Sequence, residues 1–436
     1  MHHVAALVER YFSSKNGELC FDGVPVSHIA EKYGTPLFVY DRRALELKWN
    51  AIRSALPEEF AISYSVKANP NGTVLRYYLS KGCGVEVASG GEFYQARAVG
   101  CWPGKIIFAG PGKTLGELKY VLEEEIGEIH LESLNEIDRV ATISESLDIR
   151  ARVALRINPT GEAQGGAMRM GGKPAPFGID EEILDVALDR VLSSPRLIFR
   201  GIHLFAGTQI LDHAILLDQY RKGVQIAERV ATRLGEPIQT LDFGGGLGVP
   251  YFPNEHSLDL SGLREGVLSL IEEIRREPRL KGTRFMVEPG RFLVGEAGVY
   301  VTRVNDIKVS RGKKFLITDG GMHHHLAASG NLGQTIKRNY PIALVNRLDL
   351  SAKETVDVVG PLCTPLDVLA RGVELPAAEV GDLIGVFQSG AYARTASPLG
   401  FLSHPTPPEV WVENSRDHLI RRRGTYHDSM DDLVDP

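Results

Sequence analysis

The sequence predicts an α/β protein in which a (β/α)8 TIM barrel precedes a C-terminal antiparallel β domain. Eight short apolar runs alternate with longer amphipathic stretches between about residues 60 and 290. After Arg291 strand-like runs follow one another without long helices between them. The length of 436 residues is enough for a barrel and a second domain. An open doubly wound sheet is the alternative architecture for the first part.

The eight predicted barrel strands are rich in Val, Ile, Leu and Phe, and most stop at Gly, Pro, Ser or Asn. They cover residues 61–67, 84–88, 105–108, 128–132, 152–157, 198–204, 238–243 and 284–288. Between them, residues 114–126, 215–234 and 260–276 have the apolar periodicity of helices. In the first of these, Leu115, Leu118, Val121 and Leu122 form the apolar stripe.

The second domain is predicted from strand-like runs at 299–309, 314–319, 356–359 and 382–387. Residues 36–40 have the same character and are expected to join it. We therefore divide the chain into four parts. These are an N-terminal segment (1–40) contributing to the β domain, a barrel (41–292), the C-terminal β domain (293–412) and a polar tail (413–436), interpreted as a frayed, solvated end.

Composition excludes several classes of protein. Hydrophobic residues make up 43% and charged residues 24%, which is typical of a globular chain rather than a disordered one. The sequence has no long uncharged apolar run, so no membrane span is predicted. A net charge of −6 gives no general attraction for nucleic acid. No secretory signal is visible, and four scattered cysteines without a CxxC pair suit a reducing cytoplasm.

Reactive residues are expected at the carboxyl ends of the barrel strands, where barrel active sites lie. Lys67 closes the first strand; desolvation there lowers a lysine pKa and permits Schiff-base chemistry, although a lysine reaching water is the ordinary alternative. Gly244, Gly245 and Gly246 follow the seventh strand and suit an anion such as phosphate, or form only a tight turn. After the eighth strand, Glu288 and Arg291 offer a carboxylate and a guanidinium, or a surface ion pair.

Further candidates follow other strands. His203, Phe205 and Thr208 follow the sixth strand and offer an aromatic face and a hydroxyl, unless the two rings are barrel core; Arg156 adds a cation after the fifth strand. The run His323–His325 is not expected to bind a metal, because adjacent histidines rarely face one ion. In the second domain, Cys363 lies in a turn and Tyr392 follows a glycine turn. A lysine, a phosphate site, an acid and an aromatic ring together are the set that pyridoxal phosphate needs.

Five motifs carry a family resemblance: YSVKAN (64–69), GVEVAS (84–89), DFGGG (242–246), EPGR (288–291) and GAY (390–392). In this order they resemble the fold-type III pyridoxal 5'-phosphate decarboxylases, the group of diaminopimelate and ornithine decarboxylases. The resemblance covers about residues 30–412. It implies an alanine-racemase-like barrel, a C-terminal β domain and a homodimer with active sites at the subunit interface. It also implies removal of the α-carboxylate of an amino acid through a Schiff base with the cofactor.

The resemblance implies roles for individual residues. Lys67 resembles the Schiff-base lysine, Glu288 the partner of the ring nitrogen, and Cys363 the cysteine that the partner subunit supplies to protonate Cα. The remaining cofactor-binding candidates are Glu86, Arg156, His203, Phe205, Thr208, Gly244, Gly245, Gly246, Gly290, Arg291 and Tyr392. The substrate-binding candidates are Arg291, Arg338, Tyr340, Thr364 and Asp367.

Two departures from the family pattern bear on the substrate. Phe205 stands where the family has a ring-stacking histidine. Thr364 follows Cys363 where an acid normally holds the distal ammonium of the substrate, and an acid returns only at Asp367. A buried ammonium without an acid costs about a few kcal/mol, so a substrate other than diaminopimelate is favoured.

Three segments, at 168–178, 320–325 and 360–365, resemble a narrower subgroup. It contains the butirosin-pathway decarboxylase of glutamate bound to an acyl carrier protein; exosortase-associated decarboxylases are similar. A true meso-diaminopimelate decarboxylase of lysine biosynthesis is the nearest alternative. Three further alternatives are a racemase, a catalytically inactive pyridoxal-phosphate-binding regulator and a phosphate-binding barrel enzyme without pyridoxal.

Overall fold

The computed structural model describes residues 2–160, 168–169, 174–205, 207–332, 334 and 337–434. The chain forms two compact units. The barrel unit comprises Asn50–Val249 and His256–Gly290, and the β unit comprises Met1–Trp49, Pro250–Glu255 and Arg291–Pro436. The domain boundaries given from the sequence, at residues 40, 292 and 412, stay predictions.

The barrel unit contains the predicted closed barrel of eight parallel strands. They are β5 (Phe60–Ser65), β6 (Gly84–Val87), β7 (Ile106–Phe108), β8 (Glu128–Leu131), β9 (Ala151–Asn158), β12 (Leu197–Leu204), β14 (Thr240–Asp242) and β15 (Arg284–Val287). Pairing of β8 with β9 closes the ring, so the open-sheet alternative is wrong. All eight runs predicted from the sequence are strands, within a few residues at each end.

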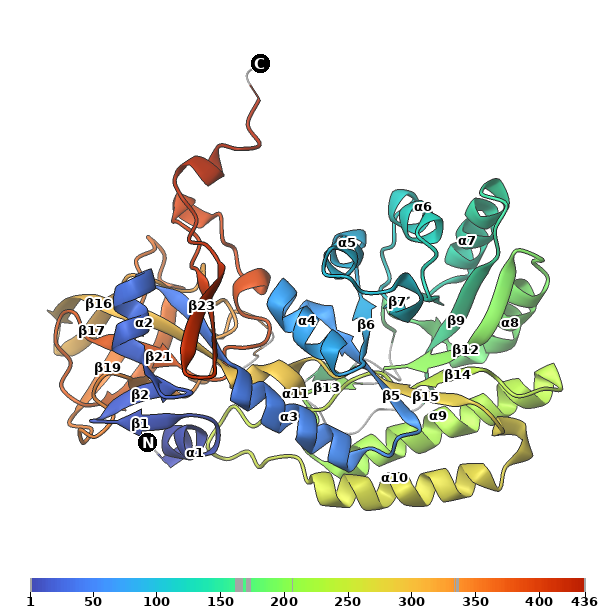
Figure 1. Cartoon of the computed structure of the whole chain (residues 1–436), viewed down its shortest axis with the longest axis horizontal. Coiled ribbons are helices and arrows are strands. Elements are labelled where there is room, and N and C mark those ends of the chain that lie inside the picture. Colours follow the sequence, from blue (N-terminus) through green and yellow to red (C-terminus); the bar gives the residue numbers. More distant parts are fainter. Residues whose placement is uncertain are drawn as a thin grey trace. The chain divides into compact units, whose positions relative to one another are not determined.

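Helices form the outer layer of the barrel (Figure 1). They are α4 (Gly72–Ser80), α5 (Gly90–Ala98), α6 (Leu115–Glu123), α7 (Leu134–Ser146), α8 (Leu184–Leu192), α9 (His213–Leu234) and α10 (Leu260–Arg275). A capping box between Thr114 and Glu117 starts α6. Leu118, Val121 and Leu122 are buried as predicted, but Leu115 at the first helical position is exposed. Within the described residues, no helix is long and apolar enough to cross a membrane.

The β unit is built on one large sheet. Its path runs β20 (Val368–Leu375), β19 (Glu354–Val359), β17 (Lys313–Thr318), β16 (Gly298–Ser310), β4 (Leu37–Asp41), β22 (Glu409–Glu413) and β23 (Arg416–Arg421). β21 (Leu383–Val386) pairs with β16 and with β18 (Ile342–Leu344). The predicted strands are confirmed, including β4 from the N-terminal segment. Most pairs are antiparallel, but β17–β19 and β4–β22 are parallel.

Smaller elements complete the N-terminal part of the β unit. They are α1 (His2–Tyr11), α2 (Val26–Tyr33) and a three-stranded sheet of β1 (Ser13–Lys15), β2 (Glu18–Phe21) and β3 (Val24–Pro25). α3 (Arg42–Ala55) begins in this unit and ends in the barrel unit.

The first part of the polar tail is folded, which corrects the prediction of a frayed end from residue 413. β23 pairs with β22, and Arg421 forms an ion pair with the buried Glu409. Asp417 accepts hydrogen bonds from Lys32 Nζ and the Tyr33 hydroxyl, both at 2.6 Å. Sequence patterning missed this because alternating polar residues describe an edge strand as well as a loop.

Candidate active site

Lys67 and Glu86 lie together at the carboxyl ends of β5 and β6. The short helix Val66–Ala68 continues β5, and Lys67 Nζ lies 2.9 Å from both carboxylate oxygens of Glu86. Ser65 Oγ donates a further hydrogen bond to Glu86 at 2.6 Å. Glu86 is buried, whereas the Lys67 side chain is 45% exposed, so the strong desolvation of Lys67 expected from the strand end is not found. The amine is held at the barrel mouth by a carboxylate.

Arg156 lies near the end of β9 and pairs with a buried acid. Its Nη1 donates to Glu132 Oε1 at 2.7 Å, and its guanidinium carbon lies 5.8 Å from the centre of the Phe205 ring. Glu132 also accepts the backbone N–H groups of Gly110 and Gly178. Burial opposes ionisation of Glu132, but Arg156 and the other donors hold its pKa below the usual range. The cation is therefore fixed beside the Phe205 ring.

The glycine loop after β14 requires glycine for two physical reasons. Gly244 and Gly246 have φ values of +67° and +100°, in the left-handed region. A Cβ on Gly245 would lie 2.6 Å from the carbonyl oxygen of Glu288, and one on Gly244 would meet the Phe205 ring at 3.0 Å. Gly290 is similarly enclosed, because its Cβ would lie 2.9 Å from that of Ala68. The loop therefore packs closely against the ends of neighbouring strands.

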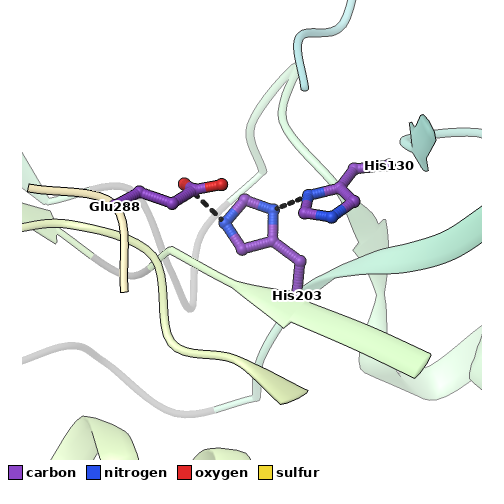
Figure 2. Close-up of side chains that lie close together, drawn as sticks. All are labelled: His130, His203 and Glu288. Carbon is purple, nitrogen blue, oxygen red and sulfur yellow. Dashed lines mark hydrogen bonds and ion pairs between the residues drawn. The ribbon is translucent and has the colours of Figure 1, made fainter. Parts of the chain in front are cut away.

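A chain of buried polar side chains runs through the barrel to Glu288 (Figure 2). His203 Nε2 lies 3.3 Å from Glu288 Oε2, and His203 Nδ1 lies 2.9 Å from His130 Nδ1. His130 Nε2 lies 3.1 Å from Glu128 Oε1. All four residues are buried.

Burial and charge set the protonation of this region. Burial lowers the pKa of His203 to about 4, despite the nearby Glu288 carboxylate. Burial also opposes ionisation of Glu288, but His203, His130 and Lys67 hold its pKa below the usual range. Burial and the Glu288 charge raise the pKa of the neighbouring Asp242. Of these two neighbouring acids, the surroundings favour ionisation of Glu288 and oppose ionisation of Asp242.

In the β unit, Arg291 lies among tyrosines. Its Nη1 donates to the Tyr251 hydroxyl at 3.1 Å, and its guanidinium carbon lies 4.6 Å from the centre of the Tyr392 ring. Tyr340 is buried and packs on Tyr251 at 4.7 Å between ring centres. Arg291 Nε is buried and has no hydrogen-bond partner among the described residues. This cation has a donor to spare.

The other β-unit candidates differ in their surroundings. Arg338 is exposed, pairs with Glu255 at 3.2 Å and stacks over Phe252. Cys363 is an exposed free thiol, and Thr364 Oγ1 accepts the backbone N–H of Leu366. Asp367, by contrast, is buried.

The run His323–His325 is packed into the β unit. His324 Nδ1 lies 3.2 Å from the Tyr300 hydroxyl, and His325 Nε2 lies 2.9 Å from Ser389 Oγ. His324 and His325 are thus core groups with polar contacts, whereas neither ring nitrogen of the buried His323 has a hydrogen-bond partner among the described residues. Of the segment at 168–178, residues 168–169 form β10 (Met168–Arg169), which pairs with β13 (Gly207–Thr208), while 170–173 lie outside the described residues.

The residues fit pyridoxal phosphate. Glu288 Oε1 is buried and has no hydrogen-bond donor among the described residues other than the neighbouring Asp242 carboxyl, which suits an acid that binds a protonated ring nitrogen. Within the barrel unit the glycine loop suits a phosphate, and Lys67 supplies an amine for an aldehyde. In the β unit, the spare donor of Arg291 also suits an anion. Phe205 offers a ring face.

Sequence reasoning missed several buried polar residues around the site. They are Glu128, His130, Glu132, Lys113, Glu136 and Asp242. A signal for three of them was present, because Glu128, His130 and Glu132 alternate along a predicted strand and therefore share its inner face. Lys113 comes from a loop, and no sequence pattern placed it.

Comparisons with known proteins agree with this site. A family model described as "Pyridoxal-dependent decarboxylase, pyridoxal binding domain" matches residues 42–295. The chain is 38% identical over 416 residues to the L-glutamyl-[BtrI acyl-carrier protein] decarboxylase of Niallia circulans, covering 95% of this chain and 96% of the relative. It is 34% identical to the diaminopimelate decarboxylase of Zymomonas mobilis, covering 97% and 98%.

Solved structures give the same result. The diaminopimelate decarboxylase of M. jannaschii in complex with L-lysine has a TM-score of 0.89 at 28% identity, with 98% of both chains covered. The resemblance stated from the motifs is confirmed, as are its fold and its enzyme class. The chain therefore belongs to the pyridoxal-dependent decarboxylases, in the diaminopimelate decarboxylase family.

Proposed function

We propose that this enzyme removes the α-carboxylate of an amino acid whose distal end carries no positive charge, such as a glutamyl group attached to a carrier protein. The observation that carries this proposal is the lack of an available acid after Cys363. Thr364 is uncharged, and the nearby Asp367 is already engaged within its own loop.

The contacts of Asp367 explain why it does not replace the missing acid. One oxygen accepts the backbone N–H of Met322 at 2.6 Å and the other that of Leu362 at 2.9 Å. Any Cβ on Gly321 or Gly360 would collide with the carboxylate, so it is enclosed on two sides. We infer that Asp367 stabilises the turn that carries Cys363 and Thr364, and that a substrate ammonium finds no counter-ion there.

The relatives support this proposal. The Niallia circulans enzyme, by its name, acts on a glutamyl group carried by an acyl carrier protein. A glutamyl group joined through its side chain keeps its α-carboxylate but has a neutral distal end, which needs no acid partner.

Each site residue then has a task. Bound pyridoxal 5'-phosphate supplies an electron sink for the negative charge left when CO2 departs. Lys67 provides the amine that holds the cofactor, with Glu86 beside it. Glu288 retains a proton at the ring nitrogen, and Phe205 and His203 contact or support the ring. Arg156 would lie near the ring. Phosphate ligands in the proposal are Gly244, Gly245, Gly246, Thr208, Arg291 and Tyr392, with Gly290 permitting close packing.

We further propose a homodimer with active sites at the interface, in which the partner subunit supplies Cys363 to protonate Cα. The exposed thiol supports this assignment, since a group that acts in another subunit must be accessible. Arg338 and Tyr340 are the proposed substrate contacts. The free state of all four cysteines supports a reducing compartment such as the cytoplasm.

A diaminopimelate decarboxylase of lysine biosynthesis is the second candidate, favoured by the 34% identity to the Zymomonas mobilis enzyme. The two candidates differ in one measurement. CO2 release is followed with a glutamyl-loaded acyl carrier protein, free glutamate and meso-diaminopimelate. Release from the carrier-bound substrate alone supports the proposal, and rapid release from meso-diaminopimelate overturns it.

A matched pair of variants tests the role of position 364. Thr364→Asp restores an acid, and its carboxylate can still accept the Leu366 N–H that Thr364 Oγ1 accepts. Thr364→Asn keeps the shape and the acceptor without the charge. We expect Thr364→Asp, but not Thr364→Asn, to gain turnover of meso-diaminopimelate. Equal behaviour of the two variants would contradict a charge-based selection at this position.

A further inference from the structure

The chain Glu128–His130–His203–Glu288 has an unusual geometry, because its two imidazoles face each other through the same type of nitrogen. The Nδ1 atoms lie 2.9 Å apart, and His203 Nε2 points at the Glu288 carboxylate (Figure 2). His130 Nε2 faces the Glu128 carboxylate at the other end of the chain. The contacts of His130 with His203 and with Glu128 are hydrogen bonds, whereas His203 Nε2 approaches Glu288 Oε2 at 3.3 Å without hydrogen-bond geometry. In each contact two lone pairs would repel each other unless one proton lay between the two atoms. All four side chains are buried, so the chain lies away from bulk solvent.

The number of protons in the chain follows from its three contacts. The three contacts need three protons, whereas two neutral imidazoles bring only two. One additional proton must therefore reside in the chain. The four groups together carry a charge of −1 instead of the −2 of two free carboxylates.

The position of the third proton follows from the surroundings. Glu288 must be ionised to hold a protonated ring nitrogen at Oε1, the oxygen that does not face His203. Burial keeps His203 neutral, so it presents Nε2–H to Glu288 and accepts at Nδ1. His130 must then donate from Nδ1, and the third proton lies between His130 Nε2 and Glu128.

We propose that Glu128 and His130 are positioning residues that fix the Nε2–H form of His203 by keeping one buried proton at the far end of the chain. This arrangement directs the His203 donor at Glu288 Oε2 and leaves Oε1 for the cofactor. The inference rests on the cofactor in the proposed function but not on the substrate.

Other charged groups face the chain from neighbouring elements. Asp242 lies beside Glu288 and also interacts with Glu128, and Thr240 Oγ1 donates to Glu128 at 3.3 Å. Lys67 acts on Glu288, and Arg156 acts on His203. The two cations favour ionised Glu288 and oppose an imidazolium at His203, which agrees with a proton held at the far end.

The spacing of these groups invites comparison with a metal site, because one ligand atom from each of His130, His203 and Glu288 falls within 4.8 Å of the others. Nitrogen atoms bound to one tetrahedral ion at about 2.0–2.1 Å are separated by roughly 3.3 Å. The two Nδ1 atoms are closer than this, at 2.9 Å, which is the distance of a hydrogen bond.

The test measures the tautomers directly, by nitrogen NMR of the cofactor-loaded protein labelled in its histidines. We expect neutral His203 protonated at Nε2, and His130 protonated at Nδ1. The third proton should appear either as a doubly protonated His130 or as a carboxylic-acid infrared band that Glu128→Gln removes. A His203 protonated at Nδ1, or two neutral imidazoles without such a band, would overturn the proposal.

A matched pair of variants separates positioning from packing. His130→Asn can donate an amide N–H to His203 Nδ1, whereas His130→Leu has similar volume and no donor. We expect His130→Leu to lose the fixed tautomer of His203 and to weaken cofactor binding about tenfold, with His130→Asn restoring most of both. Equal losses in the two variants would refute the positioning role. Since neither readout uses a substrate, an error in the proposed substrate leaves this test unaffected.

Discussion

Replacing Lys113 by methionine should strongly destabilise the barrel. Lys113 Nζ donates to Glu136 Oε1 and to the carbonyl oxygens of Gly110 and His130, each at 2.7 Å. Both charged side chains of the pair are 1% exposed. Methionine fills similar volume but leaves the Glu136 carboxylate without its counter-ion and two carbonyls without their donor.

The size of the effect follows from this burial. Breaking a buried ion pair from one side costs about 3–5 kcal/mol, because an uncompensated charge stays behind. Glu136→Gln removes that charge but keeps an acceptor for the backbone N–H of Glu132, which Glu136 Oε2 accepts at 2.8 Å. We therefore expect the double variant to be less destabilised than the sum of the single variants, by about 1–3 kcal/mol.

Native-state hydrogen exchange of the amides in α6 and α7 measures the free energy of opening next to this pair. A control is available on α6, where Lys119 and Glu123 approach at 3.8 Å. Their side chains are 59% and 50% exposed. Their removal should cost no more than about 0.5 kcal/mol. The expectation is refuted if each single variant lowers the free energy of opening by less than about 1 kcal/mol and the double variant lowers it by their sum.

Three further outcomes are expected. Lys67→Ala should remove the visible absorption of covalently held cofactor and lower CO2 release by at least ~10³-fold; turnover at the original rate would contradict its assignment. Gly246→Ala, at φ +100°, should weaken cofactor binding roughly tenfold in an equilibrium titration, while Gly282→Ala (φ +84°), with open space around it, controls for backbone strain alone. Although burial opposes it, hydrogen bonds from Lys32 and Tyr33 lower the pKa of Asp417 to about 2, so its contribution to stability is complete above about pH 4 and is lost as the pH falls toward 2. Asp417→Asn should cost about 1 kcal/mol at neutral pH and flatten that acid limb of the denaturation profile.

The barrel could be predicted because each of its strands is an apolar run bounded by turn residues, and local patterning is sufficient for such elements. The candidate site at the strand ends followed from the same pattern, since Lys67, Gly244 and Glu288 each lie within two residues of the end of a strand. β23 could not be predicted in this way. Its stability comes from Asp417 contacting α2, almost 400 residues earlier in the chain, and from Arg421 contacting Glu409.

The sequence-based prediction also left out the buried polar residues inside the barrel, and this was its larger omission. A carboxylate or histidine inside an apolar run looks like a break in the strand pattern, unless the buried residue that pairs with it is known. The partners of His130 come from three different strands or loops: Glu128 from its own strand, His203 from β12, and Lys113 at its carbonyl from the loop before α6. Pairings between such distant positions depend on closure of the barrel. Closure is inferred from the number of predicted strands, and no local sequence pattern indicates which side chains it brings together.

His130 connects the two buried networks of the barrel, and this gives the Lys113 variant a second consequence. The backbone carbonyl of His130 accepts from Lys113, while its ring links Glu128 to His203. Loss of Lys113 therefore releases the backbone that aims the imidazole at His203 Nδ1. We expect Lys113→Met to loosen the fixed tautomer of His203 as well as to lower stability, although Lys113 has no hydrogen bond to Glu288 among the described contacts. If the His203 nitrogen signals were unchanged in a Lys113→Met protein that is measurably destabilised, the two networks would be independent, and the ring of His130 would be positioned by Glu128 and His203 alone.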